Sequence, residues 1–88
     1  MITRDQLRTF LARWKAGDFG HQRLGQAFFN NVISDLRAAY EVRLRFNTAG
    51  SIILTRVSDG MVLPDPFFLE GSAALRVILR AYVDPRKD

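Results

Sequence analysis

The chain has 88 residues without a cysteine, 48% of them hydrophobic and 25% charged, and a net charge of +4. This length suits one domain, 1–88, and excludes a second; the composition excludes a disordered chain, and the lack of cysteine excludes disulfides, thiol chemistry and cysteine-ligated metals. The N-terminus lacks the apolar segment of a signal peptide and no apolar run could span a bilayer, so we expect a cytoplasmic protein without a membrane partner.

The first predicted element is a helix over residues 4–16. Thr3 and Gln6 have the spacing of a capping box, and Gly17 is placed to end the helix in a left-handed conformation. Apolar residues recur at helical spacing and give one stripe, made of Leu7, Phe10, Leu11 and Trp14.

A second helix is predicted from about His21, and two adjacent apolar rows make it the central helix of the domain. Gly25 interrupts it at a cost of about 1 kcal/mol relative to alanine, which a close approach of another element would explain. The rows are Leu24, Phe28, Val32 and Leu36, and beside them Phe29, Ile33 and Tyr40. The polar stripe opposite contains Arg23, Gln26 and Asn30.

The pattern then alternates, which predicts strands over 42–46, 51–58 and 61–63. Asp65 and Pro66 predict a capped turn, Ser72 can open a last helix, and residues 83–88 are expected to be a frayed tail. The fold class is therefore α+β, in the order α-α-β-β-β-α, with a three-stranded antiparallel meander packed on helices. Residues predicted to be buried are Leu7, Trp14, Phe28, Val32, Leu44, Ile53, Leu75 and Ile78.

The turns predict a register. A four-residue loop over 47–50 pairs Phe46 with Ser51 and Leu44 with Ile53, and a two-residue Asp59-Gly60 loop would pair Val57 with Val62. Glu41 would then face Arg56 as a cross-strand charge pair. In this register the face turned away from the core mixes arginine with aliphatic residues: Arg43, Arg45, Arg56, Ile52, Leu54, Met61 and Leu63. Such a face is typical of a protein contact, unless the last helix or a second copy of the chain covers it.

The sequence offers no catalytic constellation. His21 is the only histidine, no second metal ligand stands at a suitable spacing, and no nucleophile elbow, P-loop or dinucleotide motif occurs. We therefore expect no enzyme, no cofactor and no metal site. The many arginines could instead contact phosphates, although they are spread over several elements.

The stretch 22–30, which contains Arg-Leu-Gly-Gln-Ala-Phe-Phe-Asn, resembles a segment of the form R-x-G-Q-A-x-F-N in small phage and prophage accessory proteins. Some of those proteins also carry Asp-Pro-Phe before a closing helix, as residues 65–67 do here. The resemblance covers about a third of the chain; it does not extend to the hairpin over 41–63, and no site residue can be carried over from it. It implies a mobile-element protein in a bacterial cytoplasm that binds and inhibits a host protein, as anti-CRISPR proteins do. Because this chain is basic, a protein of this kind would block a protein surface or occupy an acidic patch, and would not mimic DNA.

The sequence therefore predicts a small inhibitor of a host protein or protein complex. The predicted contact residues are Arg43, Arg45, Arg56, Ile52, Leu54 and Met61, with Arg23, Gln26 and Asn30 on the second helix. Two alternatives stay open at this point: a basic nucleic-acid-binding protein, and a homodimer that buries the same face.

Overall fold

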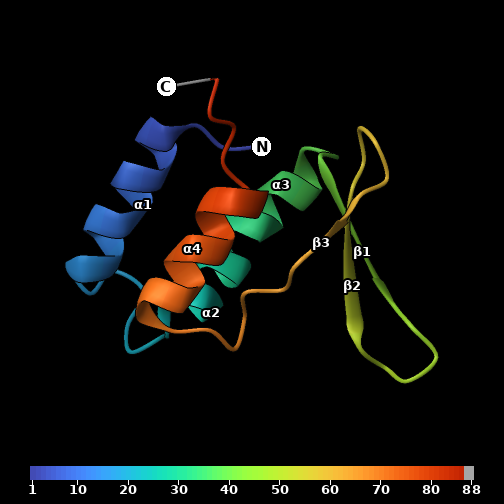
Figure 1. Cartoon of the computed structure of the whole chain (residues 1–88). Helices are drawn as coiled ribbons and strands as arrows, with labels where there is room; N and C mark the ends of the chain where they lie inside the picture. The colour runs from blue at the N-terminus through green and yellow to red at the C-terminus, as the bar shows by residue number, and fades with distance from the viewer. Residues whose placement is uncertain (87–88) are drawn as a thin grey trace.

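Helices and a three-stranded antiparallel sheet build the fold in the predicted order, which confirms the α+β class (Figure 1). The structure is a computed structural model and describes residues 1–86. The elements are α1 (Arg4–Lys15), α2 (Leu24–Phe28), the π-helical segment η1 (Phe29–Ile33), α3 (Ser34–Ala38), β1 (Val42–Phe46), β2 (Ile52–Arg56), β3 (Val62–Leu63) and α4 (Gly71–Ala81).

Helix α1 begins with the predicted capping box. The Thr3 hydroxyl accepts from the Gln6 amide at 3.0 Å, and the Gln6 side chain accepts from the Thr3 amide at 2.8 Å. Leu7 and Phe10 are buried, whereas Trp14 is only half-buried and its indole N–H donates to the carbonyl of Gln22 at 3.1 Å. Trp14 therefore links α1 to the start of the next helix and is not the core residue that was predicted.

The central helix begins at Leu24 and not near His21, and a π turn interrupts it at η1. A π turn places one extra residue in the helix, so the simple i+4 row breaks. Ile33 follows Phe28 in the core, while Val32 is half-buried. The rows were predicted for an uninterrupted α-helix, which is why Val32 is displaced from the core, whereas Leu36 beyond the π turn is buried as predicted.

Gly25 lies where the turn after β3 crosses the central helix. The Gly25 amide donates to the Leu69 carbonyl at 3.1 Å, and a Cβ at this position would lie 1.8 Å from the Pro66 carbonyl oxygen. Asp65 caps that turn as predicted, accepting from the Phe67 amide at 2.9 Å. The start of the central helix and the turn over residues 65–69 thus pack directly on each other.

The end of the chain pairs with its beginning. Ile2 and Val83 form a parallel bridge, the Ile2 amide donates to the Tyr82 carbonyl at 3.0 Å, and the Asp84 amide donates to the Ile2 carbonyl at 2.9 Å. Val83 is buried. The predicted frayed tail is therefore wrong at residues 83 and 84, and residues 87–88 lie outside the described part of the chain.

The core lies between the helices and the near part of the sheet. Figure 1 shows α1, the central helix and α4 gathered on one side, with the β1–β2 hairpin projecting away from them. Three predicted core residues, Leu7, Phe28 and Ile78, are buried, and the other five are half-buried. The buried hydrophobic core consists of Ile2, Leu7, Phe10, Leu24, Ala27, Phe28, Ile33, Leu36, Val42, Leu54, Leu63, Ala74, Ile78, Tyr82 and Val83.

Candidate interaction surface

The hairpin turn sets the register of the sheet. The Asn47 side-chain oxygen accepts from the amides of Ala49 and Ser51, both at 2.9 Å, and the Asn47 amide donates to the Ser51 carbonyl. These bonds extend the loop to residues 47–51, so Phe46 pairs with Ile52 and not with Ser51. The predicted register is wrong by one residue, and a one-residue slip moves every β2 side chain to the opposite face.

The predicted arginine and aliphatic face is therefore split. Leu54 pairs with Leu44 and with Leu63, and it is 1% exposed on the face that packs toward the helices. Ile52 lies on that same face and is half-buried. The predicted core residue Ile53 points the other way. Arg56, paired with the buried Val42, is on this face as well. Three of the predicted contact residues, Ile52, Leu54 and Arg56, thus belong to the inner face.

The outer face of the hairpin keeps two of the predicted arginines. Arg43 lies opposite Thr55, which pairs with Val62, and Arg45 lies opposite Ile53. We call these five residues the arginine face: Arg43, Arg45, Ile53, Thr55 and Val62. Both arginines are exposed, Val62 is 65% exposed, and neither guanidinium group forms an ion pair or a side-chain hydrogen bond with any of residues 1–86.

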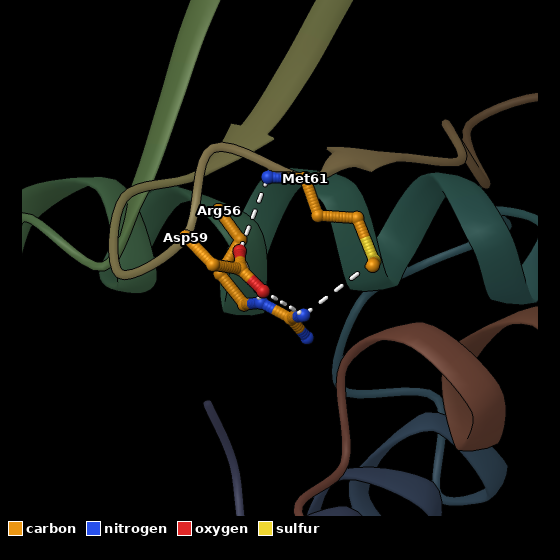
Figure 2. Close-up of polar contacts among 3 residues, drawn as sticks. All are labelled: Arg56, Asp59 and Met61. Atoms are coloured by element: carbon orange, nitrogen blue, oxygen red, sulfur yellow. Dashed lines mark hydrogen bonds and ion pairs between the residues drawn. The ribbon is translucent and has the colours of Figure 1, made fainter.

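Arg56, Asp59 and Met61 form a polar cluster in the turn between β2 and β3 (Figure 2). The Arg56 guanidinium donates to both Asp59 oxygens, at 2.9 and 2.5 Å, and the Met61 amide donates to Asp59 at 3.1 Å. The hydrogen bonds from Arg56 and then from the Met61 amide lower the pKa of Asp59 to about 2, and the same carboxylate raises the pKa of Arg56. Arg56 is thus already neutralised by a local partner.

That turn also differs from the prediction. Arg56 pairs with Met61 through its amide at 2.8 Å, so the loop comprises residues 57–60 and not Asp59-Gly60 alone. Glu41 lies opposite Val57, and its carboxylate binds the N-terminal ammonium of Met1. The predicted Glu41–Arg56 pair is therefore wrong, because Glu41 pairs with the N-terminus and Arg56 pairs with Asp59.

The polar residues predicted on the second helix lie apart from the hairpin. Arg23 stands just before α2, with its guanidinium carbon 5.6 and 5.8 Å from the ring centroids of Phe67 and Phe68. The hairpin follows the far end of the central helix, which runs through α2, η1 and α3 over residues 24–38, roughly 20 Å away at about 1.5 Å per residue. Asn30 is exposed beside Gln22, and Gln26 is half-buried. These residues do not join the arginine face.

Tyr40 is a feature that the sequence did not reveal. It was predicted in an apolar row of the second helix, yet it lies beyond α3 with a φ of 60° and a side chain that is 84% exposed. Left-handed backbone is uncommon for a residue with a large side chain. Tyr40 lines a groove between α3 and β1, together with Ser34, Arg37, Ala38, Val42, Arg43, Leu44 and Val57.

Within residues 1–86, no group of three or more histidine, aspartate or glutamate side chains lies close enough to hold a metal ion. No helix in this part of the chain has the length and apolar character needed to cross a membrane.

Comparison with known proteins found no matching family model, no matching curated protein and no matching solved structure.

Proposed function

We propose that this protein binds an acidic surface of another protein through the arginine face. The observation that carries the proposal is that Arg43 and Arg45 are exposed and unpaired within residues 1–86, on a hairpin that projects from the helices (Figure 1). No acidic residue occurs in 42–58, a segment with three arginines. Two like charges at i and i+2 on one strand face repel each other, and an acidic partner would relieve that repulsion.

The apolar members of the arginine face favour a protein as the partner. Ile53 and Val62 stand among the arginines, and aliphatic side chains beside arginine are common in protein interfaces. On the resemblance of residues 22–30 to phage accessory proteins, we extend the proposal to inhibition of a host protein complex in a bacterial cytoplasm.

A second candidate function is nucleic-acid binding, which the shape of the hairpin favours. A two-stranded β-ribbon fits the major groove of DNA, and Arg43 and Arg45 could contact phosphates. We rank this second because Ile53 and Val62 offer phosphates no hydrogen-bond donor. Binding of this kind would weaken steeply as salt is raised.

The test is affinity purification of the tagged protein from a bacterial lysate treated with nuclease, followed by mass spectrometry. We expect a defined host protein to be retained by the wild type and lost with Arg43→Glu/Arg45→Glu. The matched control is Arg76→Glu/Arg80→Glu, which changes two exposed arginines of α4. Each Arg→Glu change replaces a positive with a negative charge and lowers the net charge by two, so both double variants bring the net charge from +4 to zero.

Equal retention of the host protein by the Arg43→Glu/Arg45→Glu variant would refute a role for the arginine face. Recovery of nucleic acid alone from a parallel lysate without nuclease, released by nuclease or by moderate salt, would replace the proposal with the second candidate.

A further inference from the structure

Strand β1 is an edge of the sheet, because the strand order is β1-β2-β3. Pairing with β2 uses the odd-numbered positions: the Val57 amide donates to the Glu41 carbonyl, and the Asn47 amide donates to the Ser51 carbonyl. In an antiparallel ladder the bonded and non-bonded positions alternate. The backbone groups of Val42, Leu44 and Phe46 therefore point away from β2, toward the free edge.

The groove between α3 and β1 lies along this edge. Its lining includes Val42 and Leu44, which point to the inner face, and Arg43, which points to the outer face. The hollow therefore reaches the edge of β1 over its first residues, and Val57, opposite Glu41, also lines it there. Exposed edges with unpaired backbone groups are templates for another strand, and nothing in residues 1–86 pairs with this one.

We propose that an extended segment of the partner protein adds to β1 as a fourth strand, and that this segment alternates acidic and aliphatic residues. The inference rests on the proposed function and specifies its partner. Side chains of an added strand alternate between the two faces. On the outer face they would lie beside Arg43 and Arg45, with which acidic side chains would form ion pairs. On the inner face they would lie beside Val42, Leu44 and Phe46, against which aliphatic side chains would pack.

The charges around the edge support an acidic segment in particular. Arg37 of α3 lines the groove beside Arg43, and it too forms no ion pair with residues 1–86. Three arginines therefore border the free edge. Tyr40, exposed at the same groove, offers a ring to an aliphatic side chain of the incoming segment.

A second copy of the chain fits this edge poorly. Symmetric antiparallel pairing of two β1 strands about Leu44 would place Arg43 of one copy against Arg45 of the other, on both sides of the axis. Like charges directly opposite each other destabilise a sheet. The edge thus discriminates against self-pairing, and for the same reason it favours an acidic strand.

The first experiment measures amide hydrogen exchange by NMR with a probe peptide, acetyl-Glu-Val-Glu-Val-Glu-Val-Glu-amide. We expect saturating peptide to slow exchange at Val42, Leu44 and Phe46 by about tenfold or more. The amides of Arg43 and Arg45 already bond to β2 and should change little. The control peptide carries lysine in place of each glutamate and should protect none of these amides.

The second experiment removes one edge donor. Phe46→Pro deletes an outward N–H from an edge strand, where proline is tolerated, and Phe46→Ala is the matched control that loses the ring but keeps the N–H. We expect the proline variant to bind the acidic peptide about fivefold more weakly than the alanine variant, the effect of one hydrogen bond. The unaltered remainder of the amide spectrum verifies that both variants are folded.

Absence of edge protection at millimolar acidic peptide would overturn the inference, as would equal binding by the two Phe46 variants. Edge protection that grows with protein concentration in the absence of peptide would show a second copy as the occupant. A host protein lost with Arg43→Glu/Arg45→Glu but retained equally by both Phe46 variants would leave the proposed function standing and remove the added strand. A host protein that is retained by Arg43→Glu/Arg45→Glu but is bound more weakly by Phe46→Pro than by Phe46→Ala would support the added strand and refute the role of the arginine face.

Discussion

Single side chains decide which charges on this molecule are available to a partner. Arg56 and Arg43 belong to the same arginine-rich segment, but Arg56 is bound to Asp59 in two places, whereas Arg43 forms no ion pair with residues 1–86. The difference arises because Asp59 lies three residues beyond Arg56 and a tight turn brings them together. Whether an arginine can bind a partner protein therefore depends on its immediate neighbours, and the net charge of the chain does not show it.

The lowered pKa of Asp59 predicts how this single residue contributes to stability as the pH changes. Its pKa, lowered to about 2 from 3.8, means that its contribution to stability is fully present above about pH 3.8 and is lost as the pH falls toward 2. We expect the side-chain carbon of Asp59 to titrate near pH 2 by NMR. In Arg56→Gln, which lacks the main hydrogen-bond donor, the midpoint should rise toward 3.8. An unchanged midpoint in that variant would refute the role of Arg56.

At the scale of elements, helix propensity and packing disagree at Gly25. Propensity alone favours alanine there by about 1 kcal/mol, but the added Cβ would lie 1.8 Å from a backbone oxygen of Pro66. The turn over residues 66–69 cannot yield as the end of a flexible side chain could. The glycine is thus required by the contact between helix and turn.

We therefore expect Gly25→Ala to destabilise the protein by about 1–3 kcal/mol, as overpacking does, and to lower its thermal midpoint. The matched control is Gln26→Ala, the next residue of α2, which should change the midpoint little because glutamine and alanine have similar helix propensities. Thermal denaturation followed by circular dichroism measures both. A Gly25→Ala variant as stable as the wild type would show that the turn is not packed on α2 as described.

At the scale of the whole molecule, Phe28 joins the three helical segments. Its ring centroid lies 5.5 Å from that of Phe10 in α1 and 5.4 Å from that of Tyr82, just after α4. The Phe28 side chain is completely buried. Burial also raises the pKa of Tyr82, and the nearby Asp65 adds to this effect; the Tyr82 hydroxyl donates to the Pro64 carbonyl at 2.5 Å. The helices and the turn thus share one core.

Truncation of Phe28 to alanine should cost about 3–5 kcal/mol of unfolding free energy, a large part of the 5–15 kcal/mol that is usual for a domain. Leu79→Ala is the control, since Leu79 is 48% exposed on α4. Urea denaturation followed by fluorescence of Trp14 gives both values. Equal effects of the two truncations would contradict a core centred on Phe28.

Much of the fold could be read from local patterns. The capping box of Thr3 and Gln6 and the Asp65 cap were predicted because their hydrogen bonds join residues only two or three positions apart. The change from helical to alternating periodicity correctly located three strands. These features depend on neighbours along the chain, and so the sequence alone determined them.

The candidate surface depended on contacts that no local pattern encodes. One side chain, Asn47, lengthens a loop by one residue and thereby reverses the faces of β2, which turned Leu54 from a predicted contact residue into a core residue. The π turn at η1 shifted the apolar rows in the same way. The sequence determined that two arginines occur in an alternating strand. Only the tertiary structure decided which aliphatic residues accompany them and that β1 is left as a free edge, because register and edges are set by the packing of whole elements against one another.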